Sequence, residues 1–176
     1  MSDSQRKLAV VTGASTGIGL ELARECAKNN FDLIIAANEA EIEGAAEELR
    51  RDGGTVEVVQ ADLATTEGVD KLYGKINGRP VAALLANAGR GLGKGFLDQD
   101  FDEARDIVDT NVTGRIYLIH RVVRRMRAHG EGRILITGSM LASCRAPIRP
   151  STTAPKLSLT RSPTRYGKSL RTRASR

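Results

Sequence analysis

The sequence predicts an α/β protein built on a Rossmann-like, doubly wound parallel sheet. Short apolar runs alternate with segments whose apolar residues recur at the helical period, as expected for repeated strand–helix units. Unbroken runs such as KLAVVT are typical of strands that are covered on both faces. With the first strand at the centre, the simplest strand order is 3-2-1-4-5. The predicted strands are Lys7–Thr12, Phe31–Ala37, Thr55–Ala61, Val81–Ala86 and Gly132–Ser139.

The segments between these strands predict four helices. Thr65 or Thr66 is expected to cap the third helix, and the fourth is expected to be one long helix from about Asp100 to Arg127. Each helix carries apolar residues on a face that we predict to point inward. These residues are, helix by helix, Ile18, Leu22, Ala23 and Cys26; Ile42, Ala45, Ala46 and Leu49; Val69, Leu72, Tyr73 and Ile76; and Ile107, Val108, Val112, Ile116, Ile119 and Val123.

The composition of the chain changes near residue 140. Residues 140–176 contain nine Lys or Arg, no Asp or Glu, and four of the five prolines, whereas residues 1–139 contain 18 basic and 21 acidic side chains. We therefore expect a slightly acidic globular domain over 1–139 and a basic, disordered tail over 140–176. The sheet is expected to stop after its fifth strand, whose outer edge would then be uncovered.

Other bulk features narrow the class of protein. No apolar run approaches the ~20 residues that span a bilayer, and the N-terminal segment enters a strand without a signal-peptide pattern, which predicts a cytoplasmic protein. Cys26 and Cys144 are too few for a disulfide framework. His120 and His129 form no ligand cluster in the sequence, so no metal site is predicted.

The strongest single signal of function is the turn TGASTGIG, which follows the first strand and opens the first helix. Its glycines allow a tight turn, a close approach of a pyrophosphate to the backbone, and close packing of the helix on the strand. The helix N-terminus carries a partial positive charge that favours phosphate groups. The sequence therefore predicts a dinucleotide site here. The predicted cofactor-binding residues of this turn are Gly13, Ser15, Gly17, Ile18 and Gly19.

Four further motifs follow in order along the chain. They are ADL after the third strand, NAG after the fourth, DTNVTG within the long helix, and GRILITGS as the fifth strand. Together with TGASTGIG, they make Lys7–Ser139 resemble the short-chain dehydrogenase/reductase family. The resemblance implies an NAD(P)-binding Rossmann domain, hydride transfer between nicotinamide and a small alcohol or carbonyl substrate, and a homo-oligomer in the intact family form. It gives no reason to expect a specific nucleic acid or a membrane as partner.

The resemblance also assigns cofactor contacts to the ADL and NAG motifs. Asp62, next to Leu63, would accept a hydrogen bond from the adenine amino group. Asn87, Ala88 and Gly89 would close the floor of the cofactor site. These residues all follow strands of the predicted sheet, at the edge where doubly wound sheets bind ligands.

The choice between NAD and NADP depends on the end of the second strand. An acidic residue there binds the ribose 2′-hydroxyl, whereas a basic residue accepts a 2′-phosphate. This chain has Asn38 followed by Glu39, and no Lys or Arg between Lys28 and Arg50. The cofactor is therefore expected to be NAD or NADP, with a preference for NAD.

The catalytic residues implied by the resemblance are Asn111 and Ser139. Asn111 would hold a water that relays protons to a lysine, and Ser139 would orient the substrate carbonyl or hydroxyl. The family also uses a tyrosine as general acid/base and a lysine four residues later, and this pair does not follow Ser139. Tyr166 and Lys168 are two residues apart, which does not put them on one helical face. The chain as written is therefore predicted to be inactive.

Three functions remain open at this point. The first is an oxidoreductase by descent. The second is a non-catalytic dinucleotide-binding protein whose basic tail contacts nucleic acid or a membrane surface. The third is a methyltransferase, which also uses a glycine-rich first turn on a similar sheet. The NAG motif, Asn111 in the long helix and the GS that ends the fifth strand argue against the third.

The tail is also compatible with a shifted reading frame. Ser151–Lys156 can be back-translated so that the shifted frame reads Tyr-Asn-Gly-Thr-Lys, which has the missing four-residue step. The continuation permits an amphipathic helix without a stop codon. Because the third base of each codon is chosen in this back-translation, the result shows that the amino-acid sequence is compatible with a shifted frame. We predict that the C-terminal part is a frameshifted or truncated form of the family's C-terminus.

Overall fold

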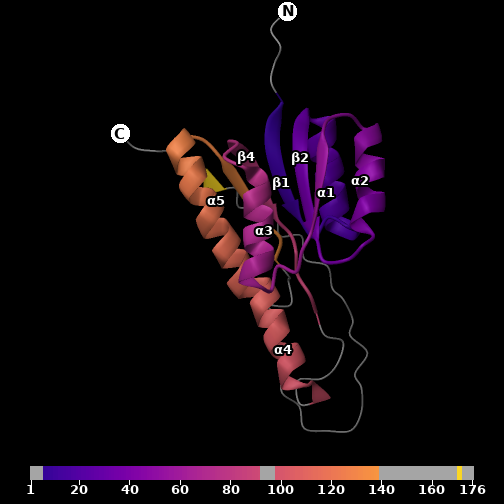
Figure 1. Ribbon diagram of the computed structural model, residues 1–176, viewed down its shortest axis with the longest axis vertical. Helices are drawn as coiled ribbons and strands as arrows, with labels where there is room; N and C mark the ends of the chain where they lie inside the picture. Colours follow the sequence, from indigo (N-terminus) through magenta and orange to yellow (C-terminus); the bar gives the residue numbers. More distant parts are fainter. Residues whose placement is uncertain (1–5, 92–97, 139–169, 172–176) are drawn as a thin grey trace, which may run out of the picture.

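The computed structural model describes residues 6–91, 98–138 and 170–171. Five strands form a parallel sheet in the order β3-β2-β1-β4-β5, which confirms the predicted fold class and strand order. Helices cover both faces of this sheet (Figure 1). The parallel strands are β1 (Lys7–Thr12), β2 (Phe31–Ala37), β3 (Val56–Gln60), β4 (Val81–Ala86) and β5 (Arg133–Ile136).

The helices form two layers, and each layer covers one face of the sheet. One layer consists of α1 (Gly17–Lys28) and α2 (Ile42–Arg51), and the other of α3 (Thr66–Ile76) and α5 (Arg115–His129). Two further segments, α4 (Phe101–Val108) and the π-helical turn η2 (Asp109–Gly114), precede α5. Among the helices that the structure describes, none has the length and apolar character needed to cross a membrane.

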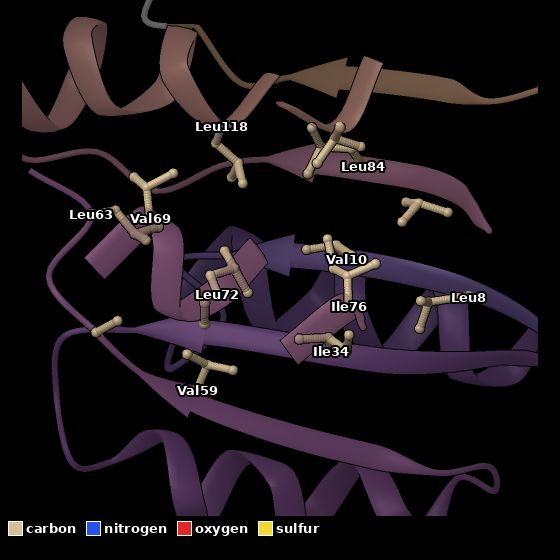
Figure 2. Close-up of a cluster of buried hydrophobic side chains, with 14 of the residues drawn as sticks. Leu8, Val10, Ile34, Val59, Leu63, Val69, Leu72, Ile76, Leu84 and Leu118 are labelled. Atoms are coloured by element: carbon tan, nitrogen blue, oxygen red, sulfur yellow. The ribbon is translucent and has the colours of Figure 1, made fainter. Parts of the chain in front are cut away.

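Alternate residues of the central strands face opposite helix layers. In β1, Val10 belongs to the core beneath α3 and α5, whereas Ala9 and Val11 belong to the core beneath α1 and α2. Figure 2 shows the first of these cores, with Leu72 of α3 among side chains of the strands, including Ile34 of β2. Both faces of the sheet are therefore buried beneath helices, which explains why its strands are continuous apolar runs.

The predicted inward faces of α2 and α3 are correct. Ile42, Ala45, Ala46 and Leu49 of α2 are all buried. In α3, Val69, Leu72 and Ile76 are buried, and Tyr73 packs against the same core. Thr65 is the residue that caps α3, because its hydroxyl accepts the N–H of Gly68.

The predicted inward face of α1 is only partly correct. Ala23 is buried as expected, but Ile18 is 64% exposed, and Leu22 and Cys26 are only half-buried. A face of small residues brings α1 close to the sheet, and the larger apolar residues lie at its sides. The buried residues of α1 are Gly19, Ala23 and Ala27.

The single long helix predicted over 100–127 is interrupted, and its inward face is only partly correct: Ile107, Ile119 and Val123 are half-buried, and Ile119 packs against the core beneath α3 and α5. Val108, Val112 and Ile116 are exposed, Ile116 by 62%, whereas α5 buries Leu118, Val122 and Met126. A π-helical turn contains more residues than an α-helical turn, so the face changes across η2 and one period does not continue through it. In addition, α4 extends past the end of the sheet, and among the described elements its main contact is with η2 (Figure 1).

The outer edge of β5 is partly covered. A two-residue strand, β6 (Leu170–Arg171), pairs antiparallel with β5 opposite Arg133 and Ile134. The expectations of a fully uncovered edge and of a tail without structure are therefore wrong for these residues. Leu135 and Ile136 lie past this pairing and are exposed. Residues 139–169 and 172–176 lie outside the described residues, so disorder there stays a prediction.

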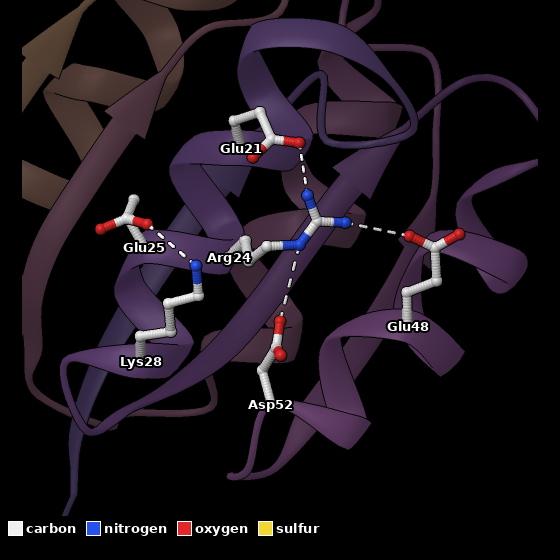
Figure 3. Close-up of polar contacts among 6 residues, drawn as sticks. All are labelled: Glu21, Arg24, Glu25, Lys28, Glu48 and Asp52. Carbon is white, nitrogen blue, oxygen red and sulfur yellow. Dashed lines mark hydrogen bonds and ion pairs between the residues drawn. The ribbon is translucent and has the colours of Figure 1, made fainter.

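A group of charged side chains joins α1 to α2 at the surface. Arg24 of α1 contacts Glu48 at 3.0 Å and Asp52 at 3.6 Å, and it also pairs with Glu21 of its own helix (Figure 3). The hydrogen bond to Glu21 is the main cause that raises the pKa of Arg24. Exposed pairs of this kind contribute little to stability, but they fix the approach of two helices that both begin near the glycine-rich edge.

The difference between buried and exposed isoleucines gives a direct test of this fold. Ile34→Ala removes a side chain with no exposed surface and should lower the free energy of unfolding by about 2–5 kcal/mol. The matched variant Ile116→Ala, on the exposed side of α5, should change it by less than about 0.5 kcal/mol. Denaturant unfolding measures both values. An equally large loss at Ile116 would show that α5 buries that face, against the described packing.

Candidate functional site

The turn between β1 and α1 requires glycine at two positions. Gly13 has a φ of +66°, and its N–H continues the sheet by donating to Ala36 O at 2.7 Å. At Gly19, a Cβ atom would lie only 1.9 Å from Gly13 O and 2.6 Å from Asn87 Nδ2. The first turn of α1 therefore packs directly on the backbone that precedes it, as predicted for this glycine.

The hydroxyl of Thr12 joins this turn to the end of β4. Thr12 is 2% exposed, and its Oγ1 accepts the N–H groups of Asn87 at 3.1 Å and Ala88 at 3.0 Å. The side-chain amide of Asn87 in turn donates to Gly13 O at 3.2 Å. Sequence reasoning did not single out Thr12. The available signal was a polar residue at the end of an otherwise apolar, buried strand.

A cavity of about 240 Å³ lies at the carboxyl ends of β1, β2, β3 and β4. Its lining includes eight of the predicted cofactor residues, brought together from four separate loops. Gly17, Ile18 and Gly19 lie beside it in the first turn of α1 and do not line it. The eight lining residues are Gly13, Ser15, Asn38, Asp62, Leu63, Asn87, Ala88 and Gly89.

Acidic side chains mark the part of the cavity that follows β2 and β3. Ser15 Oγ donates to Glu39 Oε2 at 3.3 Å, so the loop after β1 holds the carboxylate that follows β2. Asp62 accepts the N–H of Ala64 through Oδ1 at 2.9 Å, which fixes its carboxylate at the rim. Gln60 donates to the backbone oxygen of Asn38 at 3.1 Å. This part of the cavity suits hydrogen-bond donors such as hydroxyl and amino groups.

The opposite part of the cavity combines a helix terminus with a cation. Thr16 is the N-cap of α1, and its side chain makes no capping hydrogen bond to the helix. Because Thr16 lines the cavity, the end of α1 whose first N–H groups lack a side-chain cap lies at the cavity. Arg90 adds a positive charge to the same lining. Both features favour an anion such as a pyrophosphate.

Asn111 lies in η2 and holds the backbone of Arg90. Its Oδ1 accepts the Arg90 N–H and its Nδ2 donates to Arg90 O, both at 2.8 Å. A Cβ at Gly89 would lie 3.0 Å from Asn111 Oδ1, so the glycine allows this close approach. Asn111 therefore fixes the loop after β4, which the sequence did not reveal. Its predicted water-relay role stays a prediction, and Ser139 lies outside the described residues.

Arg115 connects the ends of β4 and β5. Its guanidinium donates to Ala88 O and, at 3.1 Å, to Thr137 O. Burial lowers the pKa of Arg115, because desolvation disfavours the charged form. Asn111 and Arg115, four residues apart, thus hold the loop after β4 and the end of β5 through main-chain atoms. Sequence reasoning missed Arg115, since a lone arginine in an arginine-rich helix carries no distinctive pattern.

The cavity, the glycine turn and the strand order together match a known family. A family profile described as short chain dehydrogenase matches residues 7–162. The chain therefore belongs to the short-chain dehydrogenase family, as its motifs indicated, and the match extends past Ser139.

Individual relatives are similar at about 30% identity. The L-rhamnose 1-dehydrogenase (NAD(P)(+)) of Azotobacter vinelandii is 32% identical over 150 residues, which cover 78% of this chain and 56% of that protein. Human 17-beta-hydroxysteroid dehydrogenase type 1 is 29% identical over 77% of this chain and 43% of its own length. The crystal structure of L-sorbose reductase from Gluconobacter frateurii, complexed with NADPH and L-sorbose, superimposes with a TM-score of 0.73 at 30% identity. That match covers 78% of this chain and 54% of the reductase.

The chain thus spans about half the length of the curated relatives it matches. The matched half contains the glycine-rich turn, the acidic loops, the NAG floor and Asn111.

Two glycine-to-alanine variants test the construction of the turn. Gly19→Ala should destabilise the protein by more than about 2 kcal/mol, because the new Cβ overlaps Gly13 O and the turn must move. The matched control is Gly44→Ala in α2, where a Cβ meets nothing within 4 Å and should stabilise the helix by about 0.5–1 kcal/mol. Thermal and denaturant unfolding report both. Equal stability of Gly19→Ala and the unmodified chain would contradict the close approach.

Proposed function

We propose that this chain carries the dinucleotide-binding half of an NAD(P)-dependent oxidoreductase that acts on small alcohols or carbonyl compounds. The observation that carries the proposal is the cavity at the carboxyl ends of four parallel strands, closed on one side by a turn that only glycine fits. The relatives support it: the rhamnose dehydrogenase is named with NAD(P)(+), the sorbose reductase was crystallised with NADPH and L-sorbose, and a third relative is named as a hydroxysteroid dehydrogenase.

The residues present suit a nicotinamide dinucleotide. The N-terminus of α1 and Arg90 would bind the pyrophosphate, and Asp62 would accept from the adenine amino group. Asn87 is already fixed by Thr12 and Gly13, so it would present a rigid floor. The bound dinucleotide supplies or accepts the hydride at the substrate's alcohol or carbonyl carbon.

The chain's own predicted catalytic residues would orient the substrate and a relay water, but they would not transfer the proton. We assign Ser139 to the substrate oxygen and Asn111 to the proton relay by family resemblance. The reciprocal hydrogen bonds between Asn111 and Arg90 fit a role that also keeps the floor in place. The acid/base step needs a tyrosine whose pKa a neighbouring lysine lowers from about 10. As Tyr166 and Lys168 lack the required spacing, we propose that the chain as written is inactive.

We also propose a preference for NAD over NADP. The Glu39 carboxylate lines the cavity beside Asn38, and Ser15 holds it there. A carboxylate in this place accepts hydrogen bonds from ribose hydroxyls and repels a 2′-phosphate. Arg90, the basic side chain of the described cavity lining, follows β4 and not β2.

Calorimetric titration tests both the binding and the preference. NADH should bind more tightly than NADPH. Because Glu39→Gln removes a negative charge near the ribose, it should lower the affinity for NADH and raise the affinity for NADPH, each by about three- to tenfold. The control is Glu43→Gln, an exposed glutamate in the first turn of α2. S-adenosylmethionine serves as the third ligand. Binding of that ligand alone would reject the oxidoreductase proposal in favour of a methyltransferase.

The shifted reading frame is proposed as the origin of residues 140–176. Every tyrosine codon begins with T and every lysine codon with A. In the shifted frame these first bases are the third bases of the codons for Ser151 and Pro155. We therefore expect the Ser151 codon to end in T and the Pro155 codon to end in A, which nucleotide sequencing reads directly. Any other base at either position removes the shifted pair and contradicts the proposal.

Activity assays separate this proposal from a non-catalytic protein with a basic tail. The chain as written should give no alcohol-dependent formation of NADH, whereas the chain translated in the shifted frame should form it. Robust NADH formation by the chain as written would contradict its proposed inactivity. If the shifted-frame chain binds NADH but shows no activity, the non-catalytic alternative is favoured. In that alternative the basic tail, with its nine Lys or Arg, has a binding role of its own.

A further inference from the structure

Thr110 carries an unsatisfied hydroxyl at the cavity. The residue is 7% exposed and lines the cavity, and its Oγ1 is buried without a hydrogen-bond partner. It is the one buried side-chain polar atom in this condition among the residues that the structure describes. The hydroxyl of a helical threonine can bond a carbonyl of the preceding turn, and that of Thr110 does not. Leaving such a group unpaired is unfavourable, so its presence beside a ligand cavity calls for a partner.

The surroundings of Thr110 place it between the ends of β3 and β4. Gly114, at the end of the same π-helical turn, approaches Leu63 O so closely that a Cβ would lie 1.8 Å from it. The next residue, Asn111, holds Arg90 after β4. Asp62 and Leu63 line the same part of the cavity. This part is the one to which the proposed function assigns the adenosine half of the dinucleotide.

A rotation about χ1 connects the buried hydroxyl to the cavity. The methyl and hydroxyl groups of threonine share one Cβ and are similar in size, and threonine in a helix populates two χ1 rotamers. Because Oγ1 is buried while Thr110 lines the cavity, the change of rotamer that carries Oγ1 to the cavity side presents the hydroxyl to a ligand. The place of the unpaired oxygen is then taken by an apolar group, the Cβ hydrogen or the methyl, according to the sense of the rotation.

We infer that Thr110 is a ligand-binding residue whose hydroxyl pairs with a polar group on the adenosine half of the bound dinucleotide. The inference rests on the proposed function, because it needs a dinucleotide in this cavity. It accounts for the unpaired oxygen: without a ligand the hydroxyl destabilises the fold, and with a ligand it contributes a hydrogen bond. Removing the hydroxyl should therefore change stability and affinity in opposite directions.

The test is Thr110→Val, which keeps the shape of the side chain and removes its hydroxyl. Without ligand, the thermal midpoint should rise by about 2–4 °C. The affinities for NADH and for AMP should each fall by about three- to tenfold in calorimetric titrations. Thr110→Ser keeps the hydroxyl and should retain both affinities. The control is Thr113→Val, an exposed threonine of the same turn, which should change neither affinity.

The possible outcomes distinguish a failure of the Thr110 inference from a failure of the proposed dinucleotide binding. If the unmodified chain binds neither NADH nor AMP, the proposed function fails and this inference with it. If the unmodified chain binds both and Thr110→Val binds them equally well, only the inference is overturned. A loss for NADH with no loss for AMP overturns the assignment to the adenosine half. If Thr110→Val does not fold, a loss of affinity in the folded Thr110→Ser overturns the role of the hydroxyl.

Discussion

The hydrogen bonds of the Thr12 hydroxyl determine how the edge of this sheet is built. β1 and β4 run side by side up to the pair Thr12 and Ala86, where their backbone register ends. Past this point, the Thr12 hydroxyl accepts from two successive N–H groups, so β4 stays attached to β1 for two more residues. Asn87 then reaches back to Gly13, and Gly19 packs over the same atoms. The floor and one wall of the cavity depend on this set of contacts.

Much of the fold was predictable because its sequence signals are local and repeat. Strand positions follow from apolar runs bounded by turns, and α2 shows a clean helical period with four buried residues. Eight of the residues predicted to bind the cofactor line one cavity, because parallel strands bring their carboxyl ends to the same edge. Periodicity failed where the helix geometry changes, as at Ile116 after the π-helical turn. It also failed at Ile18, because contact through small residues leaves large ones outside.

Residues that act through the backbone of distant segments were not predictable. Thr12, Asn111 and Arg115 hydrogen-bond to main-chain atoms of the loops after β4 or β5, more than 20 residues away. No short-range pattern encodes such a pairing, since any backbone group can accept or donate. The unpaired oxygen of Thr110 is likewise a property of the assembled structure and not of its sequence window.

The contact of Gly114 with Leu63 has a mechanical consequence. The rod formed by α4, η2 and α5 meets the end of β3 through main-chain atoms, with no side chain between them at Gly114. A layer of side chains can absorb a small displacement by changing rotamers, whereas two backbones in contact cannot. The same rod holds Arg90 through Asn111 and β5 through Arg115. A tilt of the rod is thus transmitted stiffly to the two cavity loops after β3 and β4 and to the end of β5, and these segments and the rod behave as one rigid part.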